Sequence, residues 1–310
     1  MKPFLIVANP ASALGRGRLV MERAVAWFAQ KGIETQTVIS QYAGHLLEAL
    51  PPLLEDNWQK IVVVGGDGTL FEVLNLCLDT MSGDGVAPFP TPLALIPSGT
   101  GNSFSKDLPA DNLEDFLQKS LHGTPQPVDV ARCHFSNSLA GGRGWYKNEF
   151  YFVNMLGTGF VAEVNVRSQR FKKLGMLGYA VGVFATLAAL RPCRLRLDLD
   201  GKTVERANTF VAICNSRYTA GNMKIAPEAN ISDSMIDVVL ANSFSRWELV
   251  RTFPKVFSGR HTSHPAVEVF RTRQLRVETD PPCLLTPDGE TLGNTPIEVE
   301  ILPGKLRFMV

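Results

Sequence analysis

The sequence predicts an α/β domain built on a parallel sheet, followed by a second domain rich in β-strands. Three observations support this fold class. An apolar, β-branched run at residues 61–64 is followed by a glycine turn and then by apolar residues at helical spacing. Strand and helix patterns alternate up to residue 121, as they do around a parallel sheet. From residue 128 onward, most segments have strand patterns separated by polar turns.

The first half is expected to form the α/β domain, at residues 1–127. Its strands are predicted at residues 4–8, 34–39, 61–64 and 93–96. Its helices are predicted at about 18–30, 41–54, from 69 onward and 113–121, with a further helix start after the turn at 97–108. Residues 123–127 contain two prolines and a glycine, so they are the expected linker.

The second half, residues 128–299, is expected to form the β-rich domain. Strands are predicted at 128–133, 149–155, 204–214, 235–240, 267–271, 274–279, 297–302 and 305–310. Helices are predicted at about 164–190 and 246–257. The final strands, about 300–310, are expected to return to the first domain and complete it.

Composition excludes several classes of protein. The net charge of +1 argues against a general nucleic-acid binder. Five scattered cysteines without a CxxC pair argue against a disulfide framework or zinc site and favour a reducing cytoplasm. The uncharged stretch 174–190 contains several glycines and is expected to be a buried helix rather than a membrane span. His261 and His264 lie in a polar loop that is expected to be a solvated turn.

The glycine turn after residue 64 has the chemistry of an anion site. Gly65, Gly66 and Gly68 leave backbone N–H groups uncovered, and the helix that follows adds its positive end. Asp67 would repel a phosphate unless a cation such as Mg²⁺ lay between them. The alternative is a sharp turn in which Asp67 caps the helix.

Two other strands end in similar turns, at residues 9–17 and 97–108. Each contains glycine and small polar residues and leads toward a predicted helix. Ligands of open α/β sheets bind at the carboxyl ends of the strands, so the turns are expected to lie at one edge. Taken alone, the loop at 9–17 could equally be an ordinary strand-to-helix connection.

The order of six motifs resembles the diacylglycerol kinase and sphingosine kinase superfamily over almost the full chain. The motifs are the Asn9–Pro10 loop and residues 40–45, 65–69, 99–102, 222–237 and 288–290. The resemblance implies an ATP-dependent lipid kinase with an α/β nucleotide domain, a β-sandwich lipid domain and an active-site cleft between them. It also implies that the following residues line the ATP site: Asn9, Pro10, Ala11, Ser12, Ala13, Ser40, Gly65, Gly66, Asp67, Gly68, Thr69, Leu70 and Thr100.

The same resemblance places the general base on a carboxylate. The bacterial diacylglycerol kinase pattern assigns this role to Glu290, which is the preferred candidate, whereas sphingosine kinases suggest Asp67. Asp288 is the third candidate catalytic carboxylate. By its pattern alone, the pair Asp288–Gly289 would be a β-hairpin turn.

A family loop that holds a structural Mg²⁺ matches residues 230–237. The resemblance implies that Asp233 is the side-chain ligand and that Asn230 and Met235 contribute backbone oxygens. Ser234 stands where glycine is usual, and Ser103 replaces a common aspartate. The serine at 234 affects the expected metal site, and the serine at 103 affects which lipid is expected as substrate.

The expected partner is a lipid substrate at a membrane surface. Arg167, Arg170, Lys172 and Lys173 precede the apolar stretch that begins at Leu174, which would allow peripheral contact with anionic lipid. A solvated helix face is the alternative, and a homodimer remains open. Diacylglycerol or a related lipid alcohol is the first substrate class. The alternatives are a sphingoid base, a soluble substrate as in NAD kinases, and a non-catalytic lipid- or nucleotide-binding regulator.

Overall fold

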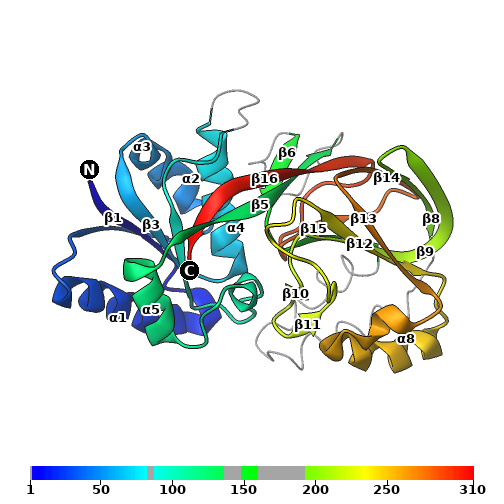
Figure 1. The fold of residues 1–310 in the computed structure, drawn as a ribbon, viewed down its shortest axis with the longest axis horizontal. Helices are drawn as coiled ribbons and strands as arrows, with labels where there is room; N and C mark the ends of the chain where they lie inside the picture. Colours follow the sequence, from blue (N-terminus) through cyan, green and yellow to red (C-terminus); the bar gives the residue numbers. More distant parts are fainter. Residues whose placement is uncertain (1, 82–86, 136–147, 160–192) are drawn as a thin grey trace. The chain divides into compact units, whose positions relative to one another are not determined.

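The computed structural model describes residues 2–81, 87–135, 148–159 and 193–310, which form two compact units (Figure 1). The first unit comprises Met1–Val130 and Pro303–Val310, and the second comprises Ala131–Leu302. Two long strands, β5 (Pro125–Phe135) and β16 (Ile297–Met309), contribute residues to both units. The chain therefore passes between the units within strands, at a point shortly after the segment 123–127 that was expected to link them.

The first unit contains a parallel sheet in the order β16-β4-β3-β1-β2. Each of the four strands predicted for this half is present. The strands are β1 (Lys2–Ala8), β2 (Thr35–Ile39), β3 (Trp58–Gly65) and β4 (Leu93–Pro97). The helices are α1 (Arg16–Gln30), α2 (His45–Ala49), α3 (Pro51–Leu54), α4 (Asp67–Asp79) and α5 (Leu113–His122).

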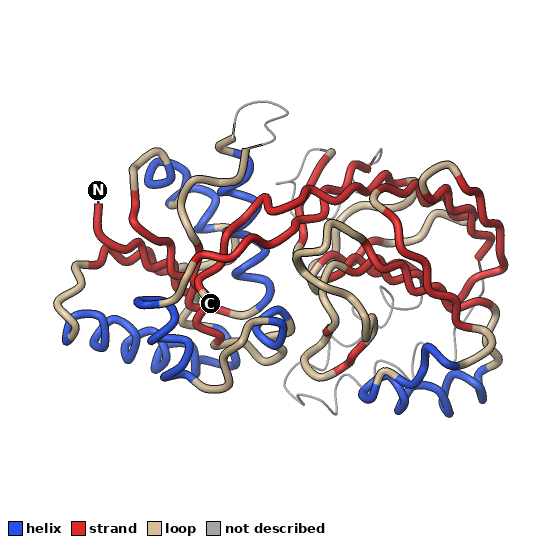
Figure 2. The backbone as a smooth tube through the Cα atoms, in the orientation of Figure 1, coloured by secondary structure: helices blue, strands red, loops and turns tan. Residues whose placement is uncertain are grey.

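Helices lie beside both faces of this sheet (Figure 2), which explains why its strands are apolar at nearly every position. On one face, Phe4 and Ile6 of β1 pack with Phe28 of α1 in a buried cluster. The residues that alternate with them, such as Leu5 and Val7, are also fully buried. The sheet is therefore the rigid part of the unit, and its loops carry the polar residues.

Two helix predictions in this unit need correction. The helix expected at 41–54 is two short helices, because Pro51 lacks the N–H that would continue the first one and begins the second instead. The turn at 97–108 leads only into a short 3₁₀ helix, η2 (Phe104–Asp107). A further 3₁₀ helix, η1 (Ser12–Gly15), precedes α1.

The second unit is mostly antiparallel. Its main path runs β13-β12-β9-β8-β14-β16, with β7 joining β9 and β15, and β6 joining β5. Its strands are β6 (Glu149–Phe152), β7 (Met155–Gly159), β8 (Cys193–Leu199), β9 (Lys202–Cys214), β10 (Tyr218–Thr219), β11 (Met223–Lys224), β12 (Ile236–Asn242), β13 (Val267–Thr272), β14 (Gln274–Asp280) and β15 (Leu285–Pro287). Its helices are α8 (Arg246–Thr252) and the 3₁₀ helices η4 (Phe253–Ser258) and η5 (Arg260–Ser263).

The sequence interpretation missed strand β8 and divided strand β16 in two. Pro303 and Gly304 suggested a turn, but the strand continues through them. Gly304 has a φ of 55°, and its N–H donates a hydrogen bond of 2.7 Å to a carboxylate oxygen of Asp129. The helix expected at 164–190 lies outside the described residues. In the part of the chain that the structure describes, no helix is long and apolar enough to cross a bilayer.

The solvated turn expected around His261 is wrong. The His261 side chain is only 2 % exposed, and its Nε2 lies 2.9 Å from the carbonyl oxygen of Ile225. A carbonyl accepts but cannot donate, so Nε2 carries the proton. Burial lowers the pKa of His261 from its usual value, and the hydrogen bond to Ile225 partly opposes that shift.

This buried histidine predicts a loss of stability in mild acid. In the unfolded chain, His261 takes up a proton near its ordinary pKa of about 6.5, whereas the folded protein resists protonation to lower pH. Stability is therefore complete above about pH 6.5 and falls as the pH drops toward the folded pKa, with a slope approaching ~1.4 kcal/mol per pH unit. Urea unfolding of the wild type and of His261→Gln across this pH range measures how the free energy of unfolding depends on pH. Equal pH slopes for the two proteins would contradict the prediction.

Candidate active site

Three loops meet at the carboxyl edge of the first unit's parallel sheet. They follow β1, β3 and β4, and hydrogen bonds join their backbones. Asn9 N–H donates to the carbonyl of Val64 at 3.0 Å, and Ser98 N–H donates to that of Gly65 at 2.9 Å. The predicted convergence of these turns is therefore present. It places them where open α/β sheets bind their ligands.

Side chains add two further links between the same loops. The Asn9 amide donates to the Thr69 hydroxyl at 3.2 Å, and the hydroxyls of Ser12 and Ser98 are 2.8 Å apart. The carbonyl oxygen of the Asn9 side chain also accepts the N–H of Ala11 at 3.1 Å. Asn9 thus fixes the shape of its own loop and connects it to helix α4.

Two glycines allow the loops after β3 and β4 to approach each other closely. A Cβ on Gly99 would lie 2.5 Å from the Cα of Gly66, which is closer than any real contact of this kind. The side chain of Asn102 also holds Gly99, accepting its N–H at 2.7 Å and donating to its carbonyl at 3.0 Å. The absence of a Cβ at both positions is therefore required for this close contact between the two loops.

Asp67 joins the loop after β3 to the loop after β4. Its two carboxylate oxygens accept the N–H groups of Ser103 at 3.0 Å and of Phe104 at 3.2 Å. The alternative that Asp67 caps its own helix is wrong, because the cap position of α4 is Gly66 and no side-chain cap is made. The Asp67 carboxylate instead meets the start of the 3₁₀ helix η2.

The remaining predicted residues at this edge differ in how far they are exposed to a ligand. Ser40 follows β2, and its N–H donates to the carbonyl of Ala8 at 2.8 Å. Thr100 is exposed and Gly68 is partly exposed, as are Pro10 and Ala13. Leu70 is 1 % exposed and packs in the core, so only its backbone can face a ligand.

Asp288 holds a second set of backbone amides, within the second unit. It is 8 % exposed, and its carboxylate accepts the N–H groups of Val153, Asn154 and Met155 at 3.3, 3.1 and 3.0 Å. Its own N–H donates to the carbonyl of Met155 at 2.9 Å. The expected turn at Asp288–Gly289 is present, with φ values of 44° and 89°. Through its carboxylate, Asp288 also fixes the backbone of residues 153–155.

Glu290 ends this turn, and its side chain differs from those of Asp67 and Asp288 in its hydrogen bonding. Its N–H donates to the carbonyl of Pro287 at 2.7 Å, and its own carbonyl accepts the hydroxyl of Thr286 at 3.0 Å. Its backbone is therefore fixed. Its partly exposed carboxylate, by contrast, makes no hydrogen bond or ion pair to any residue that the structure describes. A carboxylate whose backbone is fixed, and whose oxygens bond to no described residue, can accept a proton from a ligand.

The loop at 230–237 is built around Asp233. One carboxylate oxygen accepts the N–H of Met235 at 3.1 Å, and the other forms an ion pair with Arg271. Ser234 adopts a φ of 62°, the left-handed conformation for which glycine is better suited. The backbone at this position therefore adopts the left-handed conformation with serine in place of the usual glycine. The side-chain oxygen of Asn230 accepts the N–H of Ser232 at 3.1 Å.

Asp237, at the end of this loop, has a perturbed carboxyl group. Burial raises its pKa to about 6, Asp233 and Glu228 add to the rise, and Arg271 opposes it. One of its carboxylate oxygens is buried without a hydrogen-bond partner. Within the described ranges, no group of three metal-ligating side chains occurs, here or elsewhere. The unpaired buried oxygen of Asp237 would suit a cation, whereas both carboxylate oxygens of Asp233 already have partners.

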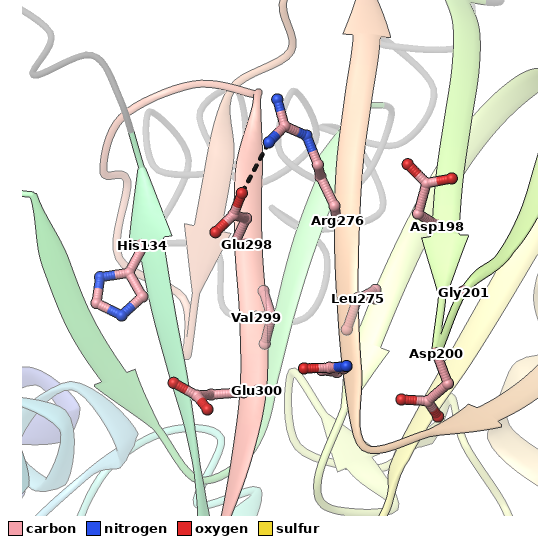
Figure 3. A pocket seen from close by; sticks show the side chains of 10 residues that line it. His134, Asp198, Asp200, Gly201, Leu275, Arg276, Glu298, Val299 and Glu300 are labelled. Atoms are coloured by element: carbon pink, nitrogen blue, oxygen red, sulfur yellow. Dashed lines mark hydrogen bonds and ion pairs between the residues drawn. The ribbon is translucent and has the colours of Figure 1, made fainter. Parts of the chain in front are cut away.

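A pocket of about 290 Å³ in the second unit contains none of the predicted site residues. It lies over β14, β16, β8 and β5, and Figure 3 shows its charged side chains. Arg276 bonds Glu298 at 2.8 Å, and Asp200 accepts the hydroxyl of Thr272 at 2.7 Å. These paired charges describe the solvated outer face of an antiparallel sheet. We assign the pocket no function.

Sequence reasoning missed the amide groups that hold the two aspartates. The partners of Asp67 lie 36 and 37 residues away, and those of Asp288 lie 133 to 135 residues away. Backbone N–H groups carry no signal of their own in a sequence. Only the positions of the aspartates were visible beforehand.

Comparison with known proteins identifies the family. The model of the diacylglycerol kinase catalytic domain matches residues 3–133, and that of the YegS C-terminal NAD kinase beta sandwich-like domain matches residues 154–310. A diacylglycerol kinase of Mycobacterium tuberculosis is 28 % identical over 307 residues, covering 98 % of this chain and 93 % of the relative. A diacylglycerol kinase of Bacillus subtilis is 26 % identical over 305 residues, covering 96 % and 93 %.

A solved structure supports the same fold. The crystal structure of a diacylglycerol kinase from Bacillus anthracis superposes with a TM-score of 0.70 at 19 % identity, covering 99 % of this chain and 96 % of that one. The second family model spans half of the chain, and the first covers nearly all of the remainder. The chain therefore belongs to the diacylglycerol kinase family of lipid kinases, with a catalytic domain followed by a YegS-type C-terminal domain.

Proposed function

We propose that this protein transfers the γ-phosphate of ATP to the hydroxyl group of diacylglycerol or a related lipid alcohol. The observation that carries the proposal is the set of three hydrogen-bonded loops at the carboxyl edge of the first unit's sheet. Family membership supports a kinase. In this proposal the first unit binds the nucleotide, and the second unit binds the lipid and supplies the base.

The first unit's residues would position the phosphates. Gly66 has no side chain of its own, so its backbone can approach phosphate oxygens. Of the Ser12 and Ser98 hydroxyls, the one that accepts the hydrogen bond between them can donate to a phosphate. Asp67 would keep the two loops in register through its amide bonds, and its negative charge would attract a cation. Mg²⁺ bound there would neutralise the charge that develops on the transferred group.

Glu290 is the proposed general base. A primary hydroxyl must lose its proton as its oxygen attacks phosphorus, and the base must not be occupied by other donors. Among the three candidate carboxylates, those of Asp67 and Asp288 are committed to backbone amides, whereas that of Glu290 is not. Asp288 then has a positioning role, because it fixes the turn on which Glu290 stands.

We further propose that the loop at 230–237 binds a structural Mg²⁺ through Asp233, with the backbone of Asn230 and Met235. Excess Mg²⁺ should then stabilise the protein, by ~1.4 kcal/mol at tenfold above Kd, or roughly 2–4 °C in Tm. Thermal unfolding with Mg²⁺ or with EDTA measures this shift. Asp233→Asn should lose it, and Arg271→Gln, which removes the same ion pair, should keep it. A full Mg²⁺ response in Asp233→Asn would contradict the assignment.

Transfer of labelled γ-phosphate from ATP in mixed micelles tests the proposed function. The acceptors are diacylglycerol, monoacylglycerol, sphingosine and ceramide, with NAD in buffer as the soluble alternative. We expect label in a glycerolipid. Label only in sphingosine would make the protein a sphingoid-base kinase, and label only in NAD would make it a soluble-substrate kinase. No transfer to any acceptor would overturn the kinase proposal in favour of a binding protein.

A further inference from the structure

Helix α8 and the 3₁₀ helix after it present aromatic side chains to solvent. This segment, residues 246–260, is called the 246–260 surface below. Trp247 is 77 % exposed and Phe257 is 42 % exposed, and Pro254 between them is exposed too. Figure 1 shows the segment in orange along one border of the second unit. Exposed apolar side chains that gather on one surface, rather than singly, can mark a binding site.

The opposite side of the segment is firmly anchored. Leu249, Thr252 and Val256 are buried at helical spacing, and Leu249 packs in a cluster with Phe244. A capping box also fixes the start of the helix, because the Ser245 hydroxyl accepts the N–H of Glu248 at 3.2 Å. The outward face is therefore held in place by the fold.

The charges on the 246–260 surface are almost all positive. Arg246, Arg251, Lys255 and Arg260 are exposed. Glu248 is the sole acidic residue between positions 246 and 260, and its carboxylate accepts the N–H of Ser245 at 2.9 Å. The segment thus has a net charge of +3, while the whole chain has +1. The positive charge is concentrated where the aromatic side chains are exposed.

We propose that the 246–260 surface docks on an anionic lipid membrane. Trp247 and Phe257 would enter the interface, where tryptophan is favoured because one end of its ring is apolar and the other can hydrogen-bond. The four cations would lie at the level of the lipid phosphates, each strengthening binding about fivefold. An apolar edge combined with a basic one is the pattern of helices that lie in the plane of a membrane.

The proposal deepens the proposed function by naming where a lipid kinase would meet its membrane. It is distinct from the basic stretch at 167–173, which lies outside the described residues. Binding needs no turnover, so it is measured without ATP. Failure of vesicle binding would leave the kinase assay above unaffected, and failure of that assay would leave vesicle binding intact.

Sedimentation with vesicles is the first test. The wild type should bind vesicles of phosphatidylcholine with phosphatidylglycerol at least tenfold more tightly than vesicles of phosphatidylcholine alone. Arg251→Glu with Lys255→Glu should lose at least tenfold of that affinity. The matched control is Arg23→Glu with Lys31→Glu, which changes an exposed cation in α1 and another directly after it, and it should bind like the wild type. Loss of binding in the control alone, or in Arg170→Glu with Lys172→Glu alone, would overturn the proposal.

Fluorescence quenching then places the aromatic side chain. Brominated phosphatidylcholine in anionic vesicles should quench the emission contributed by Trp247, obtained as the difference between the wild type and Trp247→Phe. Trp247→Ala should bind at least tenfold more weakly, while Trp247→Phe keeps most of the affinity. Wild-type binding without any quenching of the Trp247 contribution would overturn the proposal, because that side chain would then lie outside the lipid.

Discussion

Replacing Glu290 by glutamine is expected to lower kcat for phosphate transfer by about 10²–10⁴, because the variant cannot accept the proton of the attacking hydroxyl. The free energy of unfolding should stay near that of the wild type, since the Glu290 carboxylate bonds to no described residue and only its backbone holds the turn. KM for the lipid should change little. Initial rates of γ-phosphate transfer with saturating ATP measure the effect.

The control for Glu290→Gln is Glu298→Gln, which removes an exposed carboxylate elsewhere in the second unit. It should keep wild-type kcat. If Glu290→Gln also kept wild-type kcat while Asp67→Asn lost it, the base would be Asp67 and the present assignment would be wrong. The pH dependence of kcat separates the two candidate bases further. In the wild type kcat declines at acidic pH as the base takes up a proton, and the variant that lacks the base loses this decline.

Replacing Asp288 by alanine is expected to lower the free energy of unfolding by about 3 kcal/mol or more, since three backbone N–H groups lose their acceptor and each unsatisfied buried donor costs roughly 1–3 kcal/mol. Typical domains have only about 5–15 kcal/mol of stability in total. The Asp288→Ala protein should therefore unfold at much lower urea. Activity should fall with it, because the turn that carries Glu290 is no longer held.

Asp288→Asn is the conservative partner of this change. It keeps one side-chain oxygen for the amides of residues 153–155, so its stability should lie between those of the wild type and the alanine variant. A free energy of unfolding within about 1 kcal/mol of wild type for Asp288→Ala would contradict this role of Asp288. A large loss of stability here and none in Glu290→Gln would show that neighbouring carboxylates have separate roles.

The first unit was largely predictable because its signals are local. The run at 61–64, the glycines after it and the apolar residues of α4 lie within one short stretch, and the strand and helix both formed there. The errors arose where one residue overrode a pattern. Pro51 divided a predicted helix, and β16 continued through Pro303 and Gly304, where the sequence seemed to end a strand.

Strand β8 was missed although its pattern is regular. Cys193, Leu195, Leu197 and Leu199 are buried, and the residues between them face outward. The exposed positions are charged, which obscured the strand beside the long uncharged stretch before it. Of the candidate site, the carboxylates and glycines were visible in the sequence. The partners of Asp67 and Asp288 were not, because contacts between distant residues are created by folding.

Amide hydrogen exchange with and without ATP and Mg²⁺ tests the central claim most directly. The account predicts that nucleotide slows exchange in the three loops at the carboxyl edge of the first unit's sheet, at residues 9–17, 65–70 and 98–107. Exchange in β8 and β9 should not change. Protection confined to the second unit, with none in these three loops, would contradict the assignment of the nucleotide site.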